Sequence, residues 1–101
     1  MKLQKRSATG DSMKKKKFIV SGRVQGVGFR YFVYSKAKLM PIKGYVKNLY
    51  DGTVECVAEG KENQLEALHT LLTQGPSMSY VEKVVVWDLE YDEEFTGFEI
   101  R

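Results

Sequence analysis

The stretch IKGYVKNLYDGTVECVAE, Ile42 to Glu59, contains two segments of alternating polarity joined by a turn. Side chains alternate along Ile42–Leu49 and again along Thr53–Glu59. Alternation with a period of two is typical of a strand with one buried face. The intervening Asp51-Gly52 is among the strongest short-range signals for a tight hairpin turn. The sequence therefore predicts an antiparallel hairpin in the middle of the chain.

One strand and one helix are predicted on each side of this hairpin. Runs of β-branched residues favour strands, and apolar residues spaced by three and four favour helices. Pro41 ends the first helix and Gly75-Pro76 the second, as both residue types commonly do. Besides the hairpin, the predicted elements are strands at Lys17–Val24, Val81–Tyr91 and Gly97–Arg101, and helices with apolar faces at Phe29–Met40 and Leu65–Leu72.

The predicted order is β-α-β-β-α-β followed by a short C-terminal strand. This is the split βαβ, or ferredoxin-like, arrangement of the α+β class. It forms a sandwich in which two helices cover one face of an antiparallel sheet. We expect one domain over residues 17–101, since 101 residues do not accommodate two.

Charge is distributed unevenly along the chain. Residues 1–17 contain seven basic residues against Asp11, a net charge of +6, so the remainder carries −3 of the total +3. We expect residues 1–16 to be a flexible basic tail. Aromatic residues that would suit nucleic-acid binding are absent among its lysines, and we expect no nucleic-acid partner.

Compartment and membrane association can also be predicted. Cys56 is the only cysteine, so no internal disulfide can form, which suits a cytoplasmic protein. No apolar run approaches the roughly 20 residues of a membrane span. We expect a cytoplasmic monomer without a membrane partner.

The loop SGRVQGVGFRYF, Ser21–Phe32, has the composition of an anion site. Its three glycines allow positive φ and a close approach of the backbone to a ligand. Turned peptides ahead of a helix aim several N–H groups at one point. Arg30 follows directly, where the helix dipole disfavours a cation unless an anion neutralises it. Moreover, every charged residue in Phe18–Tyr50 is basic. We interpret Arg30 as an anion ligand, the alternative being a surface arginine.

Other polar residues are weaker candidates. Asn48 ends the second predicted strand, where it could hold a water beside the loop or merely form the turn. Cys56 falls on the apolar face of the hairpin, which indicates a core residue. His69 is the only histidine and cannot build a metal site alone. The chain has no Walker loop and lacks the third glycine of a dinucleotide fingerprint.

The segments GRVQGVGFR and GYVKNLYDGTVE together resemble the acylphosphatases, small hydrolases of the ferredoxin-like fold. The resemblance extends from about Phe18 to Arg101 and includes the closing GFEIR. The family usually has tryptophan in place of Tyr45 and often arginine in place of Lys47. Neither of these two positions carries chemistry, so the departures do not affect the expected activity.

The resemblance implies that catalysis depends on Arg30 and Asn48. Arg30 would bind the phosphoryl group and Asn48 would orient the attacking water. The products would be a carboxylate and inorganic phosphate, with neither a metal nor a cofactor. An alternative is a module of the same fold that binds phosphate or carbamoyl phosphate without turnover. The residues implied to bind the phosphoryl group, mainly through backbone amides, are Gln25, Gly26, Val27, Gly28, Phe29 and Arg30.

Overall fold

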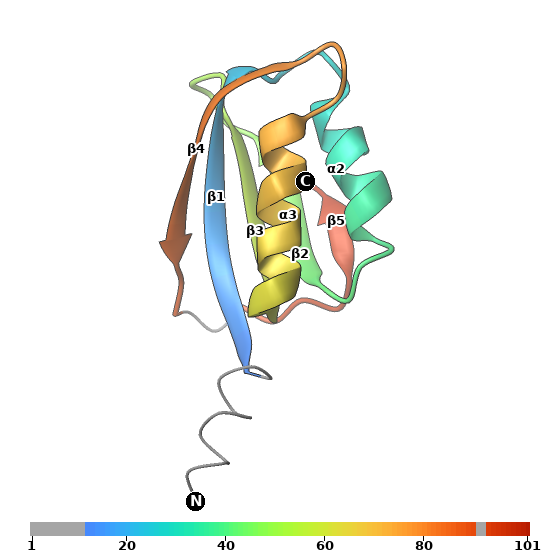
Figure 1. Ribbon diagram of the computed structural model, residues 1–101, viewed down its shortest axis with the longest axis vertical. Helices are drawn as coiled ribbons and strands as arrows, with labels where there is room; N and C mark the ends of the chain where they lie inside the picture. The colour runs from blue at the N-terminus through green and yellow to red at the C-terminus, as the bar shows by residue number, and fades with distance from the viewer. Residues whose placement is uncertain (1–11, 91–92) are drawn as a thin grey trace, which may run out of the picture.

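The computed structural model describes residues 12–90 and 93–101 of the chain. It consists of a five-stranded sheet with two helices packed against one face (Figure 1). The strand order is β4-β1-β3-β2-β5. The elements are β1 (Met13–Arg23), α2 (Phe29–Ala37), β2 (Lys43–Asn48), β3 (Val54–Lys61), α3 (Glu62–Gln74), β4 (Tyr80–Asp88) and β5 (Phe98–Ile100).

The main core lies between the sheet and the helices. The alternation in the hairpin places Val46, Val54 and Cys56 on this side, all fully buried. They pack with the predicted apolar faces of both helices, including Val33 and Leu68. The predicted α+β ferredoxin-like fold is confirmed, as is the core position of Cys56.

One feature of the predicted sheet is wrong: the sheet is mixed, not antiparallel throughout. β5 pairs with β2 in parallel, with Gly44 opposite Phe98 and Val46 opposite Ile100. After β4, at one edge of the sheet, the chain crosses to the opposite edge and reverses direction (Figure 1). Since β2 also runs opposite to β4, the reversed β5 runs parallel to β2.

The first strand begins before the predicted domain boundary. β1 starts at Met13, four residues ahead of residue 17, and Met13–Lys16 pairs with Lys61–Ala58 of β3. Lys16 Nζ also lies 3.2 Å from a carboxylate oxygen of Glu62. Lys14, Lys15 and Lys16 therefore belong to the sheet. In the sequence, their charge indicated a solvated tail instead. Of the flexible tail expected over residues 1–16, residues 1–11 lie outside the described residues.

Helix α2 is shorter than its apolar spacing predicted, ending at Ala37. The next amides form tighter bonds, from Leu39 N to Lys36 O and from Met40 N to Ala37 O. Such i→i+3 bonds tighten the end of a helix and leave its last carbonyls satisfied. Leu39 is consequently 82% exposed, whereas Met40 still packs against the core.

A second, smaller core covers part of the opposite face of the sheet. Tyr45 of β2 and Val57 of β3 pack beneath Phe95, and all three are buried. The rings of Tyr45 and Phe95 meet edge to face, with 6.0 Å between centroids. The alternation puts Tyr45 on the face of β2 opposite Val46, but it does not indicate the segment that covers this face. That segment connects β4 to β5.

Candidate active site

The glycine loop adopts the left-handed backbone that its composition predicted. Gly26 and Gly28 have φ of 75° and 78°, and Gly28 is the N-cap of α2. A Cβ at either position would meet no atom within 4 Å, so conformation rather than crowding favours glycine there. These turns lead into the start of α2, whose first amides have no partner within the helix. The loop thus has the geometry of an anion site.

A pocket of about 230 Å³ lies against this loop. Five predicted site residues line it, namely Gly26, Gly28, Phe29, Arg30 and Asn48. The fold therefore brings the two predicted catalytic side chains to one cavity, although 18 positions separate them in the sequence. The residues that the sequence did not indicate are Val24, Tyr31 and Ile100.

Arg30, at the start of α2, has no carboxylate partner in residues 12–90 and 93–101. Its Nη1 donates a hydrogen bond of 3.3 Å to the backbone oxygen of Arg101, which follows β5. The first turn of α2 contains no acidic residue, and none of the ion pairs among the described residues includes Arg30. A guanidinium so placed retains donors for an anion, and it binds carboxylate or phosphate oxygens in pairs.

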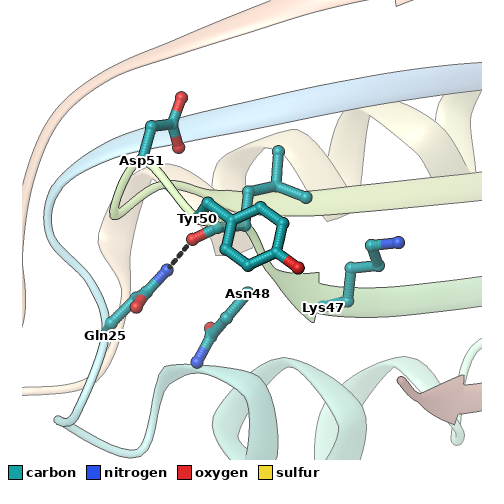
Figure 2. Close-up of a pocket in the computed structure, with 6 residues that line it drawn as sticks. Gln25, Lys47, Asn48, Tyr50 and Asp51 are labelled. Carbon is teal, nitrogen blue, oxygen red and sulfur yellow. Dashed lines mark hydrogen bonds between the residues drawn. The ribbon is translucent and has the colours of Figure 1, made fainter.

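Asn48 is the last residue of β2, and its side chain points toward the loop and the start of α2 (Figure 2). Its Oδ1 is buried and has no hydrogen-bond partner within the described part of the chain. Leaving a buried acceptor unpaired costs about 1–3 kcal/mol. An unpaired buried amide oxygen on a residue that lines the cavity is therefore consistent with a ligand or a water completing the site.

Gln25 and Val27 play different parts from the other loop residues. Gln25 Nε2 donates hydrogen bonds of 2.8 Å to the carbonyl oxygens of both Leu49 and Thr53. The first of these is the dashed line in Figure 2. This side chain connects the glycine loop to the β2–β3 turn. Val27 packs against the main core. Neither residue lines the pocket of about 230 Å³, but their backbone amides belong to the same loop.

Gln25 instead lines a second, wider cavity on the side of the β2–β3 turn, of about 820 Å³. Asn48 lines this cavity too, together with Tyr50 and Asp51 of the turn (Figure 2). Hydrogen bonds from the hydroxyl and the amide of Thr53 to Asp51 Oδ1 lower the pKa of that carboxyl. These bonds fix the turn next to Asn48.

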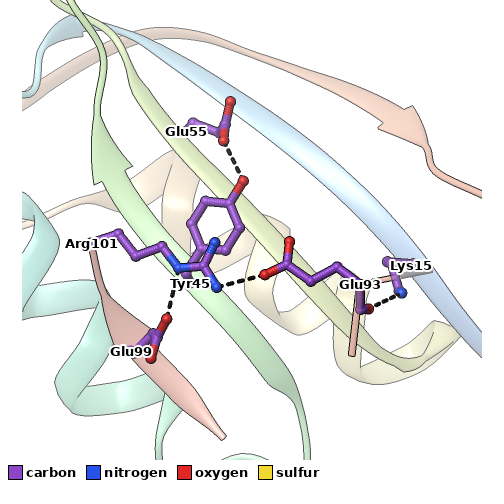
Figure 3. Close-up of polar contacts among 6 residues, drawn as sticks. All are labelled: Lys15, Tyr45, Glu55, Glu93, Glu99 and Arg101. Atoms are coloured by element: carbon purple, nitrogen blue, oxygen red, sulfur yellow. Dashed lines mark hydrogen bonds and ion pairs between the residues drawn. The ribbon is translucent and has the colours of Figure 1, made fainter. Parts of the chain in front are cut away.

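The backbone oxygen that Arg30 contacts belongs to Arg101. The Arg101 side chain is held by its neighbours (Figure 3). Its guanidinium lies 4.1 Å from the centroid of the Tyr45 ring and forms 2.7 Å contacts with Glu93 and Glu99. Hydrogen bonds to these two carboxylates raise the pKa of the guanidinium. The second core therefore supports one side of the pocket, a connection that the sequence did not indicate.

Comparison with known proteins agrees with this site. The family model for acylphosphatase matches residues 16–100. The chain belongs to the acylphosphatase family. An acylphosphatase of Pasteurella multocida (strain Pm70) is 53% identical over 89 residues, which cover 88% of this chain and 99% of that protein. The resemblance found in the sequence is thereby confirmed, and it supports the predicted acylphosphatase function.

Solved structures show the same fold. The crystal structure of acylphosphatase from Bacillus subtilis matches with a TM-score of 0.81 and 40% identity, covering 88% of this chain and 98% of that one. T. kodakarensis HypF matches with a TM-score of 0.77 and 34% identity, but the match covers 87% of this chain and only 12% of that one. A domain of this kind therefore occurs both alone and as a small part of a larger protein.

Proposed function

We propose that this acylphosphatase hydrolyses small acyl phosphates in the pocket between the glycine loop and Asn48. The backbone amides of the loop and the guanidinium of Arg30 bind the phosphoryl oxygens. Asn48 orients the attacking water. The products are a carboxylate and inorganic phosphate.

The chemistry needs few catalytic groups. The water oxygen attacks phosphorus as the bond between phosphorus and the acyl oxygen breaks, and the electrons of that bond pass to the departing carboxylate. A carboxylic acid has a pKa near 4, so the carboxylate leaves without a proton from a general acid. The proton of the water passes to a phosphoryl oxygen. Phosphoryl transfer depends mainly on positioning and electrostatic stabilisation, which amides, Arg30 and Asn48 supply.

The unpaired Oδ1 of Asn48 is the observation that carries this proposal. A neutral amide oxygen accepts a hydrogen bond from water and so aims the lone pair of the water away from itself. The pocket that Asn48 lines is bounded elsewhere by Arg30 and the glycine loop. A water on Asn48 would thus face a phosphoryl group held by those residues.

The test is release of benzoate from benzoyl phosphate at neutral pH in the presence of EDTA. We expect wild-type turnover to persist, and Arg30→Ala and Asn48→Ala each to reduce it by more than the ~10²–10³-fold lost with one preorganised donor. Asn48→Ala should retain phosphate affinity, whereas Arg30→Ala should lose it. Arg23→Ala and Asn63→Ala, both at exposed positions, are the matched controls. Near-wild-type turnover in either site variant would refute the assigned role.

A second candidate is a module that binds phosphate or carbamoyl phosphate without turnover. The match to a small part of the larger T. kodakarensis HypF supports this second candidate, because a domain within a larger chain can bind a ligand without catalysing a reaction. The same assay separates the two candidates. Protection of the fold by inorganic phosphate without benzoate release would identify the binding module.

A cytoplasmic monomer with no cofactor and no nucleic-acid or membrane partner remains part of the proposal. In the described portion of the chain, no helix is both long and apolar enough to cross a membrane. Sedimentation of the purified protein at assay concentrations would test the monomer.

A further inference from the structure

The proposed function puts the phosphoryl group in the smaller cavity, so the acyl group bonded to it lies in or near that cavity. We propose that the acyl group of the substrate lies over Tyr31 and Ile100, at the opening of that cavity, and that the ring of Tyr31 favours planar apolar acyl groups. This inference rests on the proposed function.

Asn48 is shared by the two cavities and therefore lies between them. The smaller cavity contains Arg30 and the loop, so it holds the phosphoryl group. The acyl group is bonded to that phosphoryl group, so its contacts lie in the part of the smaller cavity that is not formed by Arg30 and the loop.

Tyr31 and Ile100 are the large, exposed apolar residues of that part. Tyr31 is 66% exposed and Ile100 is 40% exposed, whereas Val24 and Phe29 in the same lining are 1% exposed. The two exposed side chains come from separate elements, α2 and β5. They offer an apolar surface at the opening of a cavity whose interior binds an anion.

The ring of Tyr31 has a support that limits its movement. It contacts the ring of Tyr34 one turn further along α2, with 6.3 Å between centroids. Side chains three residues apart are neighbours on a helix surface. Lys38 Nζ in turn lies 5.1 Å from the centroid of the Tyr34 ring. A supported ring contacts a planar acyl group with little loss of conformational entropy.

The wider cavity borders the proposed position of the water. Its lining includes Gln25, Lys47 and Asp51 as well as Leu49 and Tyr50. It opens directly onto Asn48 (Figure 2). Tyr50 is fully exposed, at 110% of the reference area. Tyr50 is therefore a matched control for Tyr31: each is an exposed tyrosine, but they border different cavities.

The experiment compares kcat/KM for benzoyl phosphate with kcat/KM for acetyl phosphate in wild type, Tyr31→Ala, Tyr31→Phe and Tyr50→Ala. An aromatic pair contributes about 0.5–1.5 kcal/mol beyond area burial, so we expect Tyr31→Ala to lower the benzoyl-to-acetyl ratio by roughly 2- to 12-fold. Tyr31→Phe, which retains the ring, and Tyr50→Ala should keep the wild-type ratio. Inhibition by inorganic phosphate should be unchanged in all variants, because the phosphoryl site is intact.

An unchanged ratio in Tyr31→Ala would overturn the inference, whether or not its overall rate falls. A ratio lowered by Tyr50→Ala instead would place the acyl group in the wider cavity. These outcomes differ from failure of the proposed function, in which wild type hydrolyses neither substrate or Asn48→Ala remains active. In that case the inference fails together with the function.

Discussion

Gln25 is a residue of the glycine loop whose side chain acts at a distance from the anion. Its two hydrogen bonds reach Leu49 and Thr53, the residues on either side of the turn that follows Asn48. Gln25→Ala removes both bonds and leaves the backbone amide of residue 25 in place. We expect a less stable protein whose phosphate site is present but whose Asn48 is poorly positioned.

The size of the effect follows from the partners. Each neutral hydrogen bond contributes about 0.5–1.5 kcal/mol net. Neither carbonyl is left unpaired, because Leu49 O also accepts from Gly52 N and Thr53 O from Leu49 N. The loss in unfolding free energy is therefore about 1–3 kcal/mol, without an added penalty for a buried orphan. For a domain near 100 residues, each kcal/mol lowers Tm by roughly 4–8 °C.

Thermal unfolding and steady-state kinetics would measure the two effects. We expect Tm to fall by roughly 4–24 °C and inhibition by phosphate to change little. We expect kcat to fall at least ~10-fold, since small misplacements cost up to ~10²-fold. The exposed Gln74→Ala on α3 is the control. If Gln25→Ala kept both the wild-type Tm and the wild-type kcat, the connection between loop and turn would have no role in the site.

Three further results are expected. Burial raises the pKa of the Cys56 thiol, so a thiol reagent should label it only after unfolding; rapid labelling of the native protein would contradict its core position. A chain starting at Lys17 should have a free energy of unfolding at least ~1–2 kcal/mol lower than one starting at Ser12, because the backbone hydrogen bonds of Met13–Lys16 with β3 are lost. Equal denaturation midpoints would contradict this. Arg101→Ala should lower the free energy of unfolding by about 1–2 kcal/mol, because its ring and ion-pair contacts are lost. It should also raise the inhibition constant of phosphate. An unchanged constant would show that Arg30 does not depend on Arg101.

Local patterns predicted those parts of the site that local backbone chemistry determines. The positive φ of Gly26 and Gly28 follows from residue type, and the start of α2 follows from the spacing of Phe29 and Val33. Arg30 could be proposed as an anion ligand because a cation at a helix start is unfavourable alone. Its place in the pocket agrees with that reasoning, and its catalytic role stays a prediction.

Contacts between distant segments could not be predicted in this way. The periodicity of β5 gives its faces but not its partner, so the parallel pairing with β2 was missed. Phe95 lies outside any predicted element, yet it buries Tyr45. The charge of Lys14, Lys15 and Lys16 suggested a solvated tail. Composition does not show that these residues pair with β3, or that Lys14 and Lys16 form ion pairs with Glu62. Asn48 was ambiguous for the same reason, since its cavity is formed by residues far from it in sequence.

The position of Asn48 also depends on Gly44, at the start of the same strand. The alternation puts Gly44 on the same face of β2 as Val46 and Asn48. Its φ is 152°, and a Cβ there would lie 1.8 Å from the carbonyl oxygen of Val57 on β3. Gly44 N also donates to Gly97 O at the start of the β5 segment. Since β2 is rigidly paired on both sides from this point, the close approach at Gly44 sets the path of the strand that ends at Asn48. The position of the Asn48 amide beside the loop thus depends on the backbone packing of β2 against β3.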